Sequence, residues 1–429
     1  MNTRTIDVKY LARVEGEGAL KIKIKDNTIT ELALKIFEPP RFFEAFLQGR
    51  NWSEAVDITS RICGICPVAY QISAAVALEN AFAVNLPEHI HQLRRLIYYG
   101  EWIESHVLHI YMLHAPDFLR YPDAISMAKD HPELVKQGLN LKKSGNSIVN
   151  LLGGREIHPI NIKVGGFYKL PNRAKVTTLL NELEEALDIA RQTLIWASGL
   201  SFPNFESQYI YLSLAKSEEY PIYRGSLKSS NGLNFPVSDF ESYIKESHVE
   251  HSNALHASLR NSGPYMTGPM ARFNMNYQYL NPTVKDLLNQ LACLEPCHNP
   301  FKSIVLRAAE VYHAVLESIS ILKKFPFDAI PSVEVQAKKA VGYGCSEAPR
   351  GVLYHKYEIN EDGRIKIANI VPPTSQNQAR IEQDLKEYVQ KFIHLEDKEL
   401  TYQCEQAIRN YDPCISCATH FLSLEVERS

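Results

Sequence analysis

The sequence carries no strong excess of one charge and no long apolar run. Its 429 residues include 46 Lys and Arg against 49 Asp and Glu, a net charge of −3, and both signs are mixed along the chain. A basic face for nucleic acid is therefore not expected. No uncharged apolar stretch reaches the roughly 18 residues that indicate a membrane span, and the N-terminal residues lack the apolar run of a signal peptide. These absences favour a cytoplasmic protein with no nucleic-acid and no membrane partner.

Cysteine is also scarce, with eight residues in the whole chain. In a reducing compartment a disulfide framework is not expected. Four of the eight, Cys293, Cys297, Cys345 and Cys404, are interpreted as ordinary buried thiols. Cys293 and Cys297 form a poor metal site, because their spacing is unusual and no second pair lies nearby. The sequence also lacks the glycine-rich dinucleotide fingerprint that follows a strand, so this chain is not expected to bind a nucleotide through that motif.

Hydrophobic residues make up 45% of the chain, which is enough to bury a large core. Alternation of apolar and polar residues around a central turn predicts two β-hairpins, over 18–37 and 351–371. Segments rich in Pro and Gly predict loops over 153–171 and 342–351. Apolar residues three and four apart predict helices over 88–113, 174–197, 303–323 and 377–393. The expected class is α+β, with a mainly helical body and small β-sheets near the N-terminus and before the C-terminal segment.

The other four cysteines form two pairs with the same spacing at opposite ends of the chain, Cys63-Gly-Ile-Cys66 and Cys414-Ile-Ser-Cys417. Four thiolates suit one soft metal centre of nickel, iron, zinc or copper(I). A structural zinc ribbon places its pairs about 15–20 residues apart, so this spacing argues against a small zinc module. Either pair alone is also compatible with a redox dithiol or with half of a zinc site.

Because both pairs have to converge on one metal, the sequence predicts a single intertwined unit over residues 1–429. Its parts are expected to be a β-rich N-terminal part (1–60), a helical body (61–340) and a C-terminal part (341–429).

The residues around both pairs resemble the two signatures of the large, catalytic subunit of nickel–iron hydrogenases. These signatures read Arg61-Ile-Cys63-Gly-Ile-Cys66-Pro67-Val68 and Asp412-Pro413-Cys414-Ile-Ser-Cys417-Ala-Thr-His420. Four further stretches stand in the family's order: Arg13-Val-Glu15-Gly16, Arg41-Phe-Phe-Glu44, Gly153-Gly154-Arg155 with His158-Pro159 and Gly165-Gly166, and Glu347-Ala-Pro349-Arg350-Gly351. The resemblance covers most of the chain, and it implies the nickel–iron hydrogenase large-subunit fold.

The resemblance implies a nickel ion held by four cysteine sulfurs. Cys63 and Cys414 would be terminal ligands, whereas Cys66 and Cys417 would bridge to an iron that carries carbon monoxide and cyanide. The implied reaction is the reversible heterolytic cleavage of dihydrogen to protons and electrons. A soft, electron-rich metal beside a base suits this reaction, and thiolate ligation can supply both. Gly64 is expected to let the backbone turn between the first two ligands.

Further site residues follow from the same resemblance. Arg350 matches the arginine above the cluster, where its permanently charged guanidinium would stabilise cyanide charge and polarise dihydrogen. Pro349 and Thr374 match groups that line the iron's diatomic ligands. Glu15 matches a glutamate that accepts a proton from a cysteine ligand, a role that suits a desolvated carboxyl with a raised pKa.

The resemblance also implies a second ion, magnesium or iron, bound by Glu44 and His420 with the backbone carbonyl of Ile370 as a third ligand. Magnesium prefers oxygen ligands and keeps water molecules, so the imidazole is an unusual member of this set. In the family a dedicated maturation protease removes whatever follows this histidine. Residues 421–429 are therefore expected to be a cleaved tail.

Two positions depart from the family pattern. Tyr70 stands where the first signature usually ends in histidine, and Ser105 stands where membrane-bound relatives carry an aspartate. These traits resemble the cytosolic, bidirectional branch that exchanges electrons with NAD(P). The leftover cysteines are too few and wrongly spaced for iron–sulfur clusters. The implied partners are an iron–sulfur small subunit and diaphorase-type NAD(P)/flavin subunits.

Other electron acceptors stay open within the enzyme class: a deazaflavin, a ferredoxin or viologen-type partner, and elemental sulfur. A protein of another class, the non-catalytic quinone-pocket subunit of respiratory complex I, shares the fold but has lost the nickel ligands. The four cysteines argue against that alternative.

Overall fold

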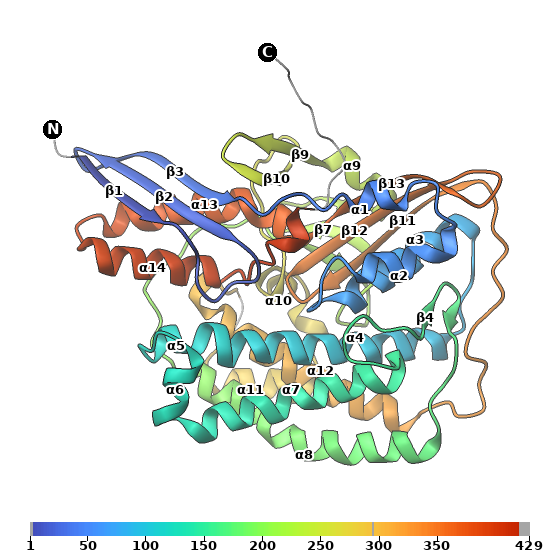
Figure 1. Ribbon diagram of the computed structural model, residues 1–429. Helices are drawn as coiled ribbons and strands as arrows, with labels where there is room; N and C mark the ends of the chain where they lie inside the picture. The colour runs from blue at the N-terminus through green and yellow to red at the C-terminus, as the bar shows by residue number, and fades with distance from the viewer. Residues whose placement is uncertain (1–2, 294–295, 420–429) are drawn as a thin grey trace.

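Helices form the body of the molecule, and several small antiparallel sheets lie along it (Figure 1). The computed structural model describes residues 3–293 and 296–419. The helices are α1 (Phe43–Leu47), α2 (Ala55–Ser60), α3 (Pro67–Phe82), α4 (Glu88–Leu108), α5 (Ala115–Phe118), α6 (Ala124–Asp130), α7 (Pro132–Gly153), α8 (Arg173–Ser198), α9 (Phe240–Tyr243), α10 (Pro269–Asn276), α11 (Pro282–Gln290), α12 (Ser303–Lys323), α13 (Pro373–Phe392) and α14 (Asp397–Arg409). The strands are β1 (Thr3–Val8), β2 (Gly18–Lys25), β3 (Thr28–Ile36), β4 (Ile162–Lys163), β5 (Gly166–Phe167), β6 (Leu212–Ala215), β7 (Ser226–Ser229), β8 (Asn234–Phe235), β9 (Ile244–Val249), β10 (Ser252–Leu259), β11 (Ala340–Ala348), β12 (Gly351–Ile359) and β13 (Ile365–Val371). This arrangement confirms the expected α+β class.

The long helices α4, α7, α8 and α12 pack side by side (Figure 1). The apolar stripe predicted for α4 is buried, as at Leu93 and Ile97. Helices α4 and α7 approach closely at Gly145, where a Cβ would lie 2.7 Å from the Glu104 amide nitrogen. None of the described helices has the length and apolar character that a bilayer crossing requires.

Helix α4 is shorter than the sequence predicted. Its regular turns end at Leu108, and the backbone continues as a π-helical segment over His109–His114. Pro116 lies two residues beyond this segment and has no amide hydrogen to donate to the preceding turn. The predicted helix over 88–113 is therefore confirmed as a regular α-helix to Leu108, and the rest of the predicted range is helical with π geometry.

The N-terminal sheet has the strand order β1-β2-β3. The hairpin of β2 and β3 confirms the period-two prediction, and its turn residues Asp26 and Asn27 both adopt positive φ. Strand β1, which pairs antiparallel with β2, was not predicted. Ile6 is the one buried residue of that edge strand, so its pattern was too weak to be recognised.

The sheet before the C-terminal segment has the order β11-β12-β13. Its β12–β13 hairpin was predicted, but the loop expected over 342–351 is wrong, because β11 occupies most of that stretch. Gly342 and Gly344 serve close packing and not a turn. A Cβ at Gly342 would lie 1.9 Å from the carbonyl oxygen of Ala77, so only glycine lets β11 lie directly on α3.

Three further sheets stand within residues 61–340, which were expected to form the helical body: the short β4–β5 hairpin, the sheet β6-β7-β8 and the β9–β10 hairpin. With α9, β12 and β13, the last two enclose a small group of buried apolar side chains that includes Leu214, Phe240 and Tyr354. A larger core runs from the N-terminal sheet through the helical body, and all four paired cysteines belong to it.

A buried ion cluster joins α4, α10, α12 and β11. The Arg272 guanidinium donates to both oxygens of Glu310 at 2.7 Å and to Glu347 at 3.2 Å, and it lies 4.6 Å from the Trp102 ring centroid. Burial lowers the pKa of His106 to about 4 although Glu310 opposes this shift, so the neutral ring donates to Glu310 at 2.9 Å. The cluster holds the carboxyl of Glu347 close to the segment that carries the predicted site arginine.

Candidate metal centre

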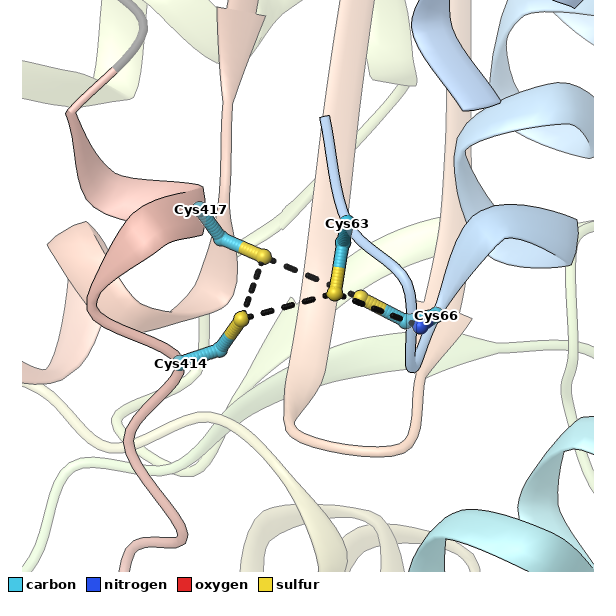
Figure 2. A group of neighbouring side chains, drawn as sticks. All are labelled: Cys63, Cys66, Cys414 and Cys417. Carbon is cyan, nitrogen blue, oxygen red and sulfur yellow. Dashed lines mark hydrogen bonds between the residues drawn. The ribbon is translucent and has the colours of Figure 1, made fainter. Parts of the chain in front are cut away.

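The two cysteine pairs come from opposite ends of the chain and meet in the larger core (Figure 2). Cys63 follows α2, and Cys66 directly precedes α3, where Pro67 starts the helix. The second pair lies on the segment after α14. The four sulfurs point toward one another: Cys63 and Cys414 are 3.5 Å apart, Cys66 and Cys417 are 3.7 Å apart, and Cys414 and Cys417 are 2.6 Å apart.

These four thiols form a donor set that fits a soft metal ion. Their ligand atoms all lie within 4.8 Å of one another, and no side chain is more than 4% exposed. Hydrogen bonds from Cys414, Cys417 and Cys66 lower the pKa of the Cys63 thiol well below its ordinary value, whereas burial raises the pKa of Cys414. Four sulfurs at one buried point are a site for nickel, iron or zinc, and not for magnesium or calcium.

The first cysteine also accepts two backbone hydrogen bonds. The amides of Ile65 and Cys66 both donate to the Cys63 sulfur at 3.3 Å. The expected role of Gly64 is wrong, because its φ is not positive and a Cβ there would meet no atom within 4 Å. The turn is therefore held by these amides and by Pro67, and it does not require glycine.

Glu15 and Arg41 tie the two cysteine segments together. The Glu15 carbonyl accepts from the Ile415 amide at 2.9 Å, and its carboxylate accepts from the Ser416 amide at 3.0 Å. Arg41 donates to the carbonyl oxygens of Ile62 and Ser416, one on each segment. Glu15 is half-buried and not fully desolvated, in contrast to the expectation. Gly16 follows it because a Cβ there would lie 2.7 Å from the Ile415 side chain.

Arg350 lies beside the cysteines and is 3% exposed. Its Nε donates to the Asp412 carbonyl at 2.7 Å and its Nη2 donates to the Asp412 carboxylate at 3.2 Å. Burial alone would lower the pKa of Arg350, but Asp412, Cys414 and Cys66 together raise that pKa well above its ordinary value. Its buried Nη1 has no hydrogen-bond partner among the described residues. One charged donor is thus left for a ligand.

Thr374 and Pro349 are also buried near this point. The Thr374 hydroxyl oxygen accepts from the Cys414 amide at 3.0 Å, which leaves its hydrogen available for donation. The Pro349 carbonyl accepts from Arg272 at 3.1 Å. The buried ion cluster around Arg272 therefore holds the backbone of Pro349 in place at the edge of the site.

The structure brings Glu44 and Ile370 together. Glu44 is buried and accepts from the Ile370 amide at 2.7 Å, so the contact described here uses the amide of Ile370 and not its carbonyl. Partial burial, followed by the charge of Glu44, raises the pKa of Glu246 to about 8. His420 and the expected cleaved tail 421–429 lie outside the described residues.

Sequence reasoning missed several residues of the site. Asp412 belongs to the second signature, but no role was predicted for it, although its charge and its position beside Pro413 could have indicated one. Glu101 on α4 accepts from the Val68 and Ala69 amides at 2.6 and 3.0 Å and so caps the first turn of α3. No local pattern marked it, because its partners are backbone groups far away in sequence.

The two departures from the family pattern are both buried. The Tyr70 hydroxyl has no partner among the described residues, and its ring lies 5.7 Å from the His355 ring. Burial, followed by the charge of Cys417, raises the pKa of Tyr70 well above its ordinary value. Ser105, on α4, likewise has a buried hydroxyl with no partner among the described residues. Tyr70 is therefore a neutral neighbour of the four cysteines.

Comparison with known proteins gives a consistent result. A family model described as nickel-dependent hydrogenase matches residues 41–137 and 260–420. Sulfhydrogenase 1 subunit alpha of Pyrococcus furiosus is 35% identical over 98% of each chain. The NAD-reducing hydrogenase HoxS subunit beta of Cupriavidus necator is 27% identical over 98% of this chain and 95% of the relative. The crystal structure of an NAD+-reducing NiFe hydrogenase in the H2-reduced state superposes with a TM-score of 0.88 at 27% identity, and covers 97% of this chain and 99% of its own.

Proposed function

Because the chain belongs to the nickel-dependent hydrogenase family as its large, catalytic subunit, we propose that it cleaves dihydrogen reversibly and heterolytically and passes the electrons through an iron–sulfur small subunit to NAD(P). The observation that carries the proposal is the convergence of Cys63, Cys66, Cys414 and Cys417 on one buried point. A complex I-type quinone subunit has no use for such a donor set, and this argues against that alternative.

In the proposal, Cys63 and Cys414 would hold nickel alone, and Cys66 and Cys417 would hold nickel together with an iron that carries carbon monoxide and cyanide. The metals, when bound, would supply the polarisation that makes dihydrogen acidic. Arg350, whose buried Nη1 has no partner among the described residues, would donate from that atom to a ligand of this site and hold a permanent positive charge there. The Thr374 hydroxyl and the Pro349 edge line the side of the diatomic ligands. The second ion, magnesium or iron, is assigned to Glu44, Ile370 and His420.

The function is tested on purified protein from cells grown with nickel. We expect stoichiometric nickel and iron, infrared bands of carbon monoxide and cyanide, and H/D exchange between dihydrogen and water. Intact mass on the same sample tests the proposed removal of residues 421–429 by a maturation protease. Protein that is fully folded but takes up zinc alone, with no exchange activity, would overturn the hydrogenase proposal.

Glu15 is proposed to take the proton from the cysteine ligands and to pass it outward. Its backbone pairs with that of Cys414, and its carboxylate receives the Ser416 amide, so the acid lies on the segment that carries the ligands. A half-buried carboxylate at this place can exchange protons with groups on both sides.

The Glu15→Gln variant is expected to lose turnover by about a hundredfold or more. A glutamine carbonyl can still accept from the Ser416 amide, so the fold and the metal content should be kept while the titrating group is removed. H/D exchange should fall with turnover, and the infrared bands should remain. The exposed neighbour Glu17 gives the control variant Glu17→Gln, which should keep full activity. Loss of the bands in Glu15→Gln would instead make Glu15 a structural residue.

The acceptor is proposed to be NAD(P), reached through diaphorase-type flavin subunits in the cytoplasm. The similarity to two proteins named for NAD reduction supports this choice. A second candidate is sulfur, because two relatives at 35% and 32% identity are named sulfhydrogenases. Identification of the co-purifying subunits, followed by hydrogen-dependent reduction of NAD(P) or of sulfur by the intact complex, distinguishes the two.

A further inference from the structure

A second group of metal-ligating side chains lies away from the four cysteines. It stands where the β9–β10 hairpin meets α13 and β3 (Figure 1). His251 is in the hairpin turn, His256 is on β10 and Glu382 is on α13. One possible ligand atom of each residue lies within 4.8 Å of the others. Two imidazoles and one carboxylate are therefore gathered by three separate elements of the fold.

The carboxylate is already oriented by its neighbours. Glu382 Oε1 accepts from the Leu34 amide of β3 at 2.9 Å and from His251 Nε2 at 2.7 Å. Backbone support of this kind is typical of metal sites, because it fixes the direction of the ligand. The rings of His251 and His256 stand nearly perpendicular at 85°, with centroids 5.8 Å apart.

An ion pair between His251 and Glu382 does not explain why His256 is buried beside them. His256 is 7% exposed, and its buried Nε2 has no hydrogen-bond partner among the described residues. An unsatisfied buried polar atom costs about 1–3 kcal/mol, so its position needs a reason. Burial lowers the pKa of His256, which keeps the ring neutral and its lone pair available to a metal.

We propose that His251, His256 and Glu382 bind one divalent transition-metal cation that fastens the β9–β10 hairpin to α13. The donor set of two imidazoles and a carboxylate suits zinc and the neighbouring first-row ions. The cation replaces the proton now shared by His251 and Glu382 and gives the free nitrogen of His256 a partner. His251 and Glu382 are 29% and 18% exposed, so the cation can enter from solvent and keep water in its open position.

The test uses the metal-loaded holoenzyme, whose cysteine site is filled, and zinc as the probe. Titration against a chromophoric zinc chelator should show one additional equivalent that is bound reversibly. Hydrogen exchange of amides in 244–259 should slow when zinc is added, because the hairpin is then held at both its turn and its second strand. Activity is not the readout, so failure of this proposal is separate from failure of the proposed function.

Variants identify the ligands. His256→Gln and Glu382→Gln should each weaken zinc binding by at least about tenfold. His251→Gln changes a partly exposed residue of the turn and should weaken zinc binding to the same degree. His248→Gln changes an exposed histidine of the same hairpin and should bind zinc as the unchanged protein does. No additional equivalent of zinc, or an equal affinity in all four variants, would overturn the proposal.

Discussion

Cys63→Ala is expected to reduce the rate of hydrogen uptake by at least about a thousandfold, because a site whose ligands act as one unit loses nearly all function when one ligand is deleted. The Cys63 sulfur contacts that of Cys414 at 3.5 Å and accepts the amides of Ile65 and Cys66. Alanine leaves three sulfurs and two unpaired amides at a buried point. Nickel content, measured by elemental analysis, should fall together with activity.

The matched control for this variant is Cys404→Ala. Cys404 is as fully buried as the ligands but lies on α14, outside the four-sulfur group. It should keep nickel and activity and show only the modest loss of stability expected for a small core truncation. A Cys63→Ala protein with full nickel content and full uptake would show that the metal is held elsewhere.

Arg350→Lys is expected to lower turnover by about tenfold or more while the metal content stays intact. The guanidinium uses Nε and Nη2 on Asp412 and presents Nη1 without a partner. An ammonium keeps the charge but cannot hold Asp412 and at the same time present a donor in the same plane. Loss of one preorganised donor is a typical cause of such a fall in rate.

Hydrogen uptake and infrared spectra of the diatomic ligands check this variant. The control is Arg364→Lys, which changes an exposed arginine in the turn between β12 and β13 and should leave turnover unchanged. Equal rates for Arg350→Lys and the unchanged protein would place the guanidinium outside the reaction. Shifted infrared bands with a reduced rate would support direct contact with the diatomic ligands.

Local patterns predicted the parts of the fold that have a regular period. The β2–β3 and β12–β13 hairpins and the helices α8 and α12 follow from alternation or from three-and-four spacing. Strand β11 was missed because Gly342 and Gly344 were interpreted as turn residues. These glycines are needed because β11 packs directly against α3, which is distant in sequence.

In the candidate site, too, residues within local motifs were predicted and residues with distant partners were not. Motif resemblance pointed to the cysteines and to Arg350, and the structure brings them together. It did not point to Asp412, whose partner Arg350 is distant in sequence. The group of His251, His256 and Glu382 left no signal, since its members stand on three elements without a shared spacing. Residues whose role depends on long-range contacts could not be predicted from local patterns.

The meeting of the two cysteine pairs has a consequence for biosynthesis. The pairs are 351 residues apart in the chain, and at translation rates of about 5–20 residues per second the second pair follows the first by roughly 18–70 s. During that interval Cys63 and Cys66 emerge from the ribosome as an unaccompanied dithiol, open to zinc and to oxidation. The pairing of Ile415 with Glu15 cannot form until the ribosome has passed the second pair. The metal centre is thus a post-translational structure, and a nascent chain needs protection of its first two thiols before nickel arrives.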